Sequence, residues 1–224
     1  MEEVLPHVSI IVPTMRSRTK FIHLVVRNLI SQTYPSDKIE VLVVGDEDHL
    51  TRRVFEDISS VFEGRKFRYI ACGISDNIGQ KRNFCCEQAS HKIIAMMDDD
   101  DMYNREYIEH SVRELRRLKK GIVGCKDMII TWPSLDFETR YVKGSSIHEG
   151  TMVFRKSHWK RNKFKECRTG EGVQMVRTDD GSSYNDIDIR KIMMCVAHDS
   201  NTFNKTPILS NGTPLAIGED KKQP

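Results

Sequence analysis

Four apolar, β-branched runs recur in the first hundred residues, and segments with helical spacing of apolar side chains separate them. The apolar runs cover residues 7–12, 39–44, 67–71 and 92–97, and the helical segments cover residues 19–32, 50–62 and 79–90. Short apolar runs that alternate with helices are typical of parallel strands buried on both faces. The first half of the chain therefore predicts an α/β fold with a mostly parallel sheet, helices on both faces and right-handed crossovers.

The pattern changes after residue 101, where one long helix precedes shorter strands. The helix is predicted over residues 105–119, and the strands over residues 121–131, 140–142 and 151–155. No linker rich in proline, glycine or serine separates the two halves, so we predict one domain over residues 1–207 and a frayed tail over residues 208–224. Within that domain, residues 102–207 would form an α+β extension of the sheet built by residues 1–101.

Charge and composition exclude several classes of partner. The chain of 224 residues has a net charge of only +3, with acids and bases interleaved, so we expect no nucleic-acid partner. No apolar stretch approaches the roughly 20 residues that span a bilayer, and the amino-terminal residues lack the basic and apolar regions of a secretory signal. Six cysteines without a C-x-x-C pair predict buried free thiols rather than a zinc site, and hence a cytoplasmic protein.

Four consecutive aspartates, Asp98 to Asp101, directly follow the apolar run at residues 92–97. In an extended chain, Asp98 and Asp100 would project to the same side about 6.6 Å apart. At an effective dielectric of about 20, two such carboxylates repel by about 2.5 kcal/mol, and a hard divalent cation removes that cost. An exposed acidic loop is the simpler alternative. Because ligands of open α/β sheets bind at the carboxyl ends of the strands, we favour a metal site.

The turn after the first strand argues against a dinucleotide-dependent oxidoreductase. Such an enzyme needs G-x-G-x-x-G there, so that the pyrophosphate can approach the backbone closely. The chain instead has the sequence PTMRSR at residues 13–18, which contains no glycine. A nicotinamide cofactor is therefore not expected.

Six segments together resemble the sequence pattern of glycosyltransferase family 2, whose members have the GT-A fold. In chain order they are VSIIVPTMRSR, SQTYPSDKIEVLVVGD, DNIGQKRNFCCEQASHKIIAMMDDDD, HEGTMVFRK, GEGVQMVR and AHDSNT. The resemblance covers nearly the whole chain, from about residue 7 to about residue 207. It implies a metal-dependent, inverting glycosyltransferase that moves a sugar from a UDP-sugar to a hydroxyl group of a glycan, a glycoprotein or another acceptor.

The resemblance assigns the nucleobase to the ends of the first two strands. Pro13, Thr14 and Arg16 would line the nucleobase pocket, and Asp46 would accept a hydrogen bond from a uracil imide. Relatives often carry two acids where this chain has Gly45 and Asp46. An ordinary turn at the end of a strand is the alternative role for Asp46.

The segment from Asn77 to Asn83 matches the stretch that precedes the metal motif in the family, so Asn77 is a predicted donor contact. Gly79, also predicted at the donor, permits a tight turn into a helix whose amino end favours anions. Lys81 and Arg82 would add positive charge beside the diphosphate. A basic helix surface is the alternative explanation for these two side chains.

The family carries a D-x-D metal motif, which matches Asp98 and Asp100 in this chain. Asp100 would bind Mn²⁺ or Mg²⁺ directly, and Asp98 would contact the ribose or a metal-bound water. The extra acids leave the register open by one residue, so Asp99 is also a candidate nucleotide contact. His198 matches the late histidine that completes the metal site in many GT-A enzymes, although a lone histidine after a strand is often structural.

The family's Glu-Asp motif, whose second acid acts as the catalytic base, becomes Glu171-Gly172 here. Glu171 is the carboxylate that remains in the motif and is the first candidate for the base, and Glu149 is the second. A glutamate at a helix start without any chemical role is the alternative. Two other functions stay open: a nucleotidyltransferase, and a non-catalytic module that binds nucleotide sugars with a metal, for which the missing acid at position 172 argues.

Overall fold

A computed structural model describes residues 4–62, 64–74, 77–176, 185–201 and 204–215 of the chain. Its first half alternates strands and helices, as predicted. The strands are β1 (Val8–Pro13), β2 (Ile39–Asp46), β3 (Lys66–Cys72) and β4 (Ile93–Met96). The helices are α1 (Ile22–Ile30), α2 (His49–Asp57) and α3 (Ile78–Gln88), with 3-10 turns at Arg16–Phe21, Ser36–Lys38 and Ser59–Phe62.

The second half has shorter elements. Its strands are β5 (Met102–Tyr103), β6 (Ile122–Gly124), β7 (Met128–Trp132), β8 (Glu138–Val142), β9 (Val153–Arg155), β10 (Asn185–Asp186), β11 (Met193–Val196) and β12 (Thr213–Pro214). Its helices are α4 (Tyr107–Arg117), α5 (Lys156–Arg161), α6 (Val173–Val176) and α7 (Ile208–Asn211). Short 3-10 turns occur at Pro133–Leu135, Glu149–Thr151 and Ile189–Lys191.

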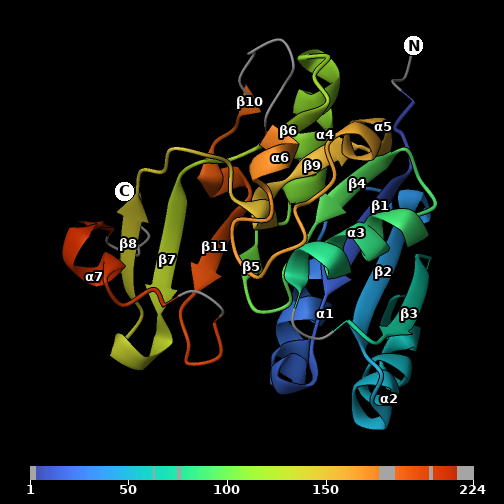
Figure 1. Cartoon of the computed structure of the whole chain (residues 1–224), viewed down its shortest axis with the longest axis horizontal. Helices are drawn as coiled ribbons and strands as arrows, with labels where there is room; N and C mark the ends of the chain where they lie inside the picture. The colour runs from blue at the N-terminus through green and yellow to red at the C-terminus, as the bar shows by residue number, and fades with distance from the viewer. Residues whose placement is uncertain (1–3, 63, 75–76, 177–184, 202–203, 216–224) are drawn as a thin grey trace, which may run out of the picture.

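These strands form two sheets that lie side by side (Figure 1). The larger sheet has the order β10-β6-β9-β4-β1-β2-β3, and the smaller has the order β12-β8-β7-β11-β5. In the larger sheet β1 pairs in parallel with both β2 and β4. The carboxyl ends of these three strands therefore meet at one edge, where ligands of α/β sheets bind.

The predicted strand over residues 121–131 is wrong as a single strand, because it divides into β6 and β7 in different sheets. After β6, the backbone N–H of Cys125 donates to the Thr151 hydroxyl over 2.9 Å instead of to a neighbouring strand. The chain thus leaves the larger sheet. The predicted extension of that sheet is right for β6 and β9, whereas β7 and β8 belong to the smaller sheet.

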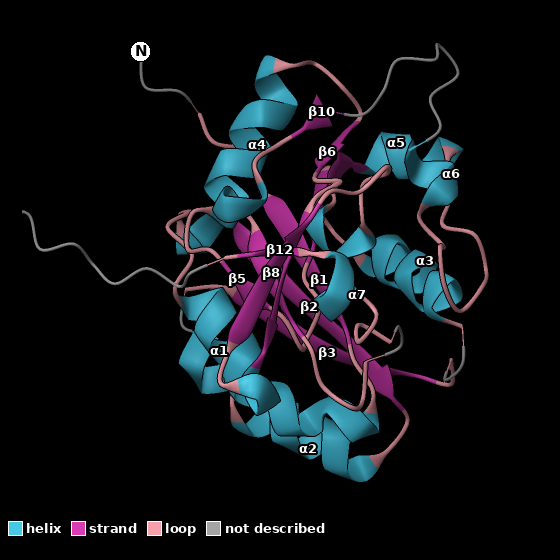
Figure 2. Ribbon diagram, turned by 90° about the vertical axis from the view of Figure 1, so that its left-hand side faces the viewer, coloured by secondary structure: helices cyan, strands magenta, loops and turns pink. Residues whose placement is uncertain are grey.

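The core lies on both faces of the larger sheet, as alternation along β1 shows. Val8, Ile10 and Val12 pack on one face with residues of α1 and α4. Ile11 points to the other face and packs with residues of α3, α5 and α6. Figure 2 shows these two groups of helices on opposite sides of the strands. Burial on both faces explains why the strands of the first half are continuous apolar runs.

Several smaller expectations can also be compared with the structure. Residues 208–215, predicted as part of a frayed tail, form α7 and β12 instead, and β12 pairs with β8. The rest of that tail, residues 216–224, lies outside the described residues. All six cysteines are free and five of them are buried, as predicted. Within the described part of the chain, no helix is long and apolar enough to cross a membrane.

A buried carboxylate fastens β1 and β2 to the segment before β4. Glu40 is fully buried and accepts hydrogen bonds from the Ser9 hydroxyl at 2.6 Å and from the Ser90 N–H at 2.8 Å. The Nη2 atom of Arg68 lies 3.1 Å from Glu40 Oε1. Burial would raise the pKa of Glu40, but these hydrogen bonds and the Arg68 charge lower it to about 2.

Replacing Glu40 with glutamine should lower the free energy of unfolding by about 2 kcal/mol at pH 7, since hydrogen bonds to charged groups contribute roughly 1.5–3 kcal/mol. The carboxylate stabilises the fold fully above its ordinary pKa of 4.5, and this contribution is lost as the pH falls through about 2. Urea titrations should therefore show a smaller difference from wild type at pH 2.5 than at pH 7. Equal differences at the two pH values would contradict this account.

Candidate functional site

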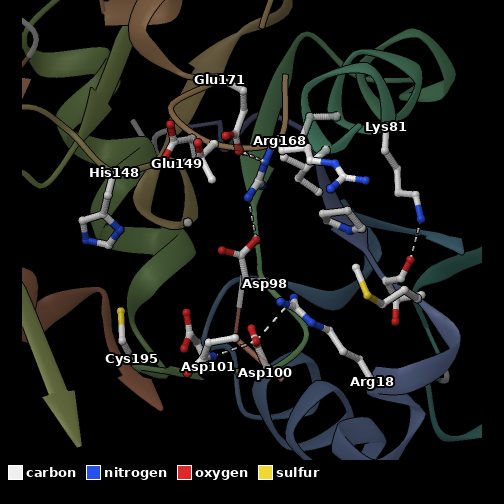
Figure 3. A pocket seen from close by; sticks show the side chains of 18 of the residues that line it. Arg18, Lys81, Asp98, Asp100, Asp101, His148, Glu149, Arg168, Glu171 and Cys195 are labelled. Atoms are coloured by element: carbon white, nitrogen blue, oxygen red, sulfur yellow. Dashed lines mark hydrogen bonds and ion pairs between the residues drawn. The ribbon is translucent and has the colours of Figure 1, made fainter. Parts of the chain in front are cut away.

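A cavity of about 520 Å³ opens at the edge where β1 and β4 end. Its wall combines the end of β1, the start of α3, the aspartates after β4, two loops around residues 148–150 and 168–171, and the segment after β11. Segments far apart in the sequence therefore contribute charged side chains to one space (Figure 3).

The four consecutive aspartates, called here the aspartate tetrad, form a turn and not an extended strand. The expected alternation of side chains therefore does not apply. Asp99 is 1% exposed and accepts a hydrogen bond from the Thr14 hydroxyl at 2.6 Å, and Asp101 accepts one from the Val196 N–H at 2.9 Å. Burial and the charge of Asp100 raise the pKa of Asp99 to about 7 and that of Asp101 to about 8. These two acids tie the tetrad to β1 and β11.

Asp100 is the member of the tetrad best prepared to hold a cation. Its Oδ2 atom lies 3.1 Å from His198 Nε2, 3.3 Å from Arg18 Nη1 and 3.3 Å from Asn201 Nδ2. Burial would raise the pKa of Asp100, but the hydrogen bond with His198 and the charge of Arg18 lower it. Asp100 is therefore ionised at neutral pH beside the cavity.

The contact between Asp100 and His198 is a hydrogen bond, and its length also fits two neighbouring ligands of one octahedral cation that would displace the shared proton. Ligand atoms at right angles, each about 2.1 Å from the ion, lie about 3 Å apart. No group of three His, Cys, Asp or Glu side chains able to hold a metal occurs among the described residues. A cation here would thus depend on water and phosphate oxygens for its other ligands, as Mg²⁺ commonly does. Asp98, the predicted partner of Asp100, contacts Arg82 instead, at 3.1 Å.

Arg82 is a buried cation that joins the tetrad to a second acidic group. Its Nη2 atom lies 3.1 Å from Asp98 Oδ1, and its Nε atom lies 2.9 Å from Glu171 Oε1. Burial would lower the pKa of Arg82, but the charges of Asp98 and Glu171 raise it above its ordinary value. Among the described residues, its buried Nη1 atom has no hydrogen-bond partner. Arg82 also lines the cavity, so its positive charge would attract an anion there.

The two glutamates predicted as catalytic bases lie close together on one wall of the cavity (Figure 3). Glu171 is buried, and its carboxylate accepts the hydrogen bond from Arg82. Burial raises the pKa of Glu171, the charge of Arg82 opposes this rise, and the charge of Glu149 adds to it. Glu149 is half-buried and accepts a hydrogen bond from the Gly172 N–H at 2.8 Å.

The residues predicted to bind the nucleobase form a hydrogen-bonded cluster at the ends of β1 and β2. The Lys81 ammonium donates to the Thr14 carbonyl and to Asp46 Oδ1, both at 2.9 Å. The Arg16 N–H donates to Asp46 Oδ2 at 3.0 Å. Lys81, predicted beside the diphosphate, therefore contacts the residues predicted for the nucleobase.

At Gly79, in its first turn, α3 packs closely against a neighbouring loop. Asn77 accepts a hydrogen bond from the Gln80 N–H at 3.0 Å and so caps the helix. A Cβ atom at Gly79 would lie 1.9 Å from the Lys165 carbonyl oxygen, so a side chain there would collide with the loop. Asn77 and Gly79, predicted at the donor, thus shape the helix that carries Arg82.

The predicted site residues divide into those that line the cavity and those that lie outside its lining. The lining includes Pro13, Thr14, Lys81, Arg82, Asp98, Asp100, Glu149 and Glu171. Outside the lining are Arg16, Asp46, Asn77, Gly79, Asp99 and His198. Asp46, Asp99 and His198 of the second group contact Lys81, Thr14 and Asp100 of the first through hydrogen bonds, so these predicted residues occupy one region.

Sequence analysis missed three basic residues that line the cavity, namely Arg18, Arg168 and Lys205. Arg18 lies 3.1 Å from Asp99, and Lys205 lies 3.9 Å from Asp101. Their charges offset part of the tetrad's negative charge. Nothing in the sequence distinguishes Arg18 from the other basic residues before α1, because the segment is a 3-10 turn without a clear helical face.

The chain is similar to known glycosyltransferases. The sequence matches a family model described as glycosyl transferase family 2 over residues 9–165. The protein named glycosyltransferase AglE from Haloferax volcanii is 29% identical over 126 residues, which are 55% of this chain and 40% of that protein. The match therefore spans less than half of that relative's length.

Solved structures share the fold at low sequence identity. S. aureus TarS 1–349 in complex with UDP has a TM-score of 0.65 and 17% identity, covering 85% of this chain and 60% of that one. The mannosyltransferase PcManGT from Pyrobaculum calidifontis, in complex with GDP-Man and Mn²⁺, has a TM-score of 0.66 and 18% identity. The match covers 87% of this chain and 57% of that one. Both are GT-A glycosyltransferases, so the predicted GT-A fold is confirmed.

Replacing Arg82 with methionine should lower the free energy of unfolding by about 3–5 kcal/mol at pH 7, because buried Glu171 and partly buried Asp98 lose their counter-charge. Urea titration measures this loss. Arg53→Met is the matched control, since Arg53 is 77% exposed and its pair with Asp57 should contribute less than about 1 kcal/mol. Similar losses in the two variants would contradict the buried role of Arg82.

Proposed function

Because the chain belongs to glycosyl transferase family 2, we propose that it is an enzyme that transfers a sugar from a nucleotide-sugar donor to a hydroxyl acceptor. We propose inversion at the anomeric carbon and dependence on Mn²⁺ or Mg²⁺. The observation that carries the proposal is the ionised Asp100, 3.1 Å from His198, in the same cavity wall as the buried guanidinium of Arg82. A cation site and a buried guanidinium together suit a diphosphate.

In this proposal the chain's own charges hold the donor's phosphates. Asp100 and His198 would bind the cation, and Nη1 of Arg82 would donate to a phosphate oxygen. The bound cation would stabilise the negative charge that develops on the leaving diphosphate. Arg82 adds to this effect without reorganisation, because Asp98 and Glu171 already fix its orientation.

For the nucleotide we propose UDP, with Asp46 as acceptor for the uracil imide. Both oxygens of Asp46 already accept one hydrogen bond each, from Lys81 and Arg16. Each carboxylate oxygen can accept a second, so the role stays available. One structural neighbour was solved with UDP and another with GDP-Man, so GDP is the alternative nucleotide.

For the acceptor we propose a hydroxyl group of a glycan, a glycoprotein or a similar molecule. The buried free thiols favour a reducing compartment, which supports a cytoplasmic location. A non-catalytic module that binds nucleotide sugars is the second candidate, and Gly172 in place of an acid is the observation that favours it.

Incubation with UDP-sugars and GDP-mannose, with and without Mn²⁺, tests the proposal. Release of a nucleoside diphosphate would support glycosyl transfer to water or to an added acceptor. Metal-dependent binding without release would favour the non-catalytic module. In a parallel incubation with nucleoside triphosphates, release of pyrophosphate would indicate a nucleotidyltransferase instead.

Replacing Asp100 with asparagine should weaken Mn²⁺-dependent binding of UDP by at least about tenfold, since loss of even the outer-shell partners of metal ligands costs about 10–100-fold in metal affinity. The fold should persist, because the change also relieves repulsion from Asp99 and Asp101. Isothermal titration calorimetry with Mn²⁺ or with EDTA measures the effect. Asp57→Asn, at a side chain 70% exposed on α2, is the matched control. Unchanged binding by Asp100→Asn would count against the cation site.

A further inference from the structure

Gly172 has no side chain at the point where the chain passes Glu149. A Cβ atom at position 172 would lie 2.7 Å from Glu149 Oε1 and 2.8 Å from Glu149 Cγ. The Gly172 N–H donates to that same Oε1 atom over 2.8 Å. The carboxylate of Glu149 therefore fills the space in which a side chain at position 172 would begin.

The backbone next to Glu149 is fixed against the aspartate tetrad. The Tyr103 hydroxyl donates to the Gly150 carbonyl over 2.8 Å and accepts from the Asp98 N–H over 2.9 Å. A Cβ atom at Gly150 would lie 2.8 Å from Asp98 Oδ2, so a side chain there would require Asp98 to move. Glu149 is thus held beside the start of the tetrad, on the cavity wall that Figure 3 shows.

Glu171 is held in an ion pair with the buried Arg82. Its side chain is 6% exposed, and its Oε1 atom accepts a hydrogen bond from Arg82 Nε at 2.9 Å. Burial raises the pKa of Glu171, yet a proton on Glu171 would deprive buried Arg82 of a counter-charge, which is costly. A proton on Glu149 keeps that ion pair and removes the repulsion between two neighbouring carboxylates.

We propose that Glu149 is the catalytic base of the transfer reaction, and that Glu171 is a positioning residue for Arg82. This inference rests on the function proposed above. The acceptor oxygen forms its bond to the anomeric carbon while the bond from that carbon to the diphosphate oxygen breaks. The electron pair of the broken bond leaves with the diphosphate, and the hydroxyl proton passes to a Glu149 oxygen.

Hydrolysis of a nucleotide sugar, with water as the acceptor, tests the assignment. The probe is whichever of UDP-glucose, UDP-GlcNAc and GDP-mannose the wild-type protein hydrolyses fastest with Mn²⁺. Glu149→Gln should lower kcat by at least about 100-fold, as loss of a general base does, with the donor KM within about threefold. Glu171→Gln should raise the donor KM by more than about fivefold through Arg82, while kcat stays within about fivefold.

A swap of the carboxylate between the two positions separates proton transfer from a folding defect. Glu149→Gly combined with Gly172→Asp removes the carboxylate of Glu149 and places that of an aspartate in the space that becomes free. Glu149→Gly combined with Gly172→Asn is the matched control, because it has the same shape without the charge. We expect the aspartate combination to turn over at least about tenfold faster, with equal binding of UDP and Mn²⁺ in both.

Two outcomes would overturn the assignment of Glu149 and leave the proposed function in place. One is a Glu149→Gln protein that retains more than about a tenth of the wild-type kcat, against the loss expected of a general base. The other is equal turnover by the two swap combinations, which also decides the matter if Glu149→Gln does not fold. Wild-type protein that releases no nucleoside diphosphate from any donor would overturn the proposed function itself, and this inference with it.

Discussion

Four adjacent carboxylates at the end of one buried strand are the constraint on which the site depends, because their mutual repulsion must be offset inside the protein. The fold offsets it by giving each acid a cationic or hydrogen-bonding partner. Asp98 pairs with Arg82, and Arg18 contacts both Asp99 and Asp100. Asp101 accepts a backbone hydrogen bond from β11. These partners come from distant segments, so the charges of the tetrad are offset only in the folded protein.

Glycines let the other cavity walls approach the tetrad closely. Side chains at Gly79, Gly150 or Gly172 would collide with the Lys165 carbonyl, with Asp98 or with Glu149, respectively. Their role is close approach, since none of the three has the positive φ that favours glycine. The cavity thus combines dense packing behind its wall with charged groups on its surface, as a preorganised site requires.

Sequence patterns predicted the elements whose signal is local, and missed the features that depend on remote partners. The strands β1 to β4 followed from apolar runs buried on both faces. The split between β6 and β7 did not follow from the local sequence. It depends on Thr151, which lies far along the chain and whose hydroxyl accepts the hydrogen bond from the Cys125 N–H. Lys81 and Arg82 are adjacent on α3 and were assigned together, yet helical rotation sends one to the end of β2 and the other to the tetrad.

Arg82 also connects the two acidic groups of the cavity. On one side it holds Asp98, at the start of the tetrad that includes Asp100, and on the other it holds Glu171, beside Glu149. A phosphate bound at its Nη1 atom would interact with the same positive charge that stabilises the carboxylates of Asp98 and Glu171. Donor binding would then leave less positive charge to stabilise the carboxylates of the glutamate pair, which favours proton uptake there. In the proposed reaction, a single guanidinium would thus link the binding of phosphate to proton transfer.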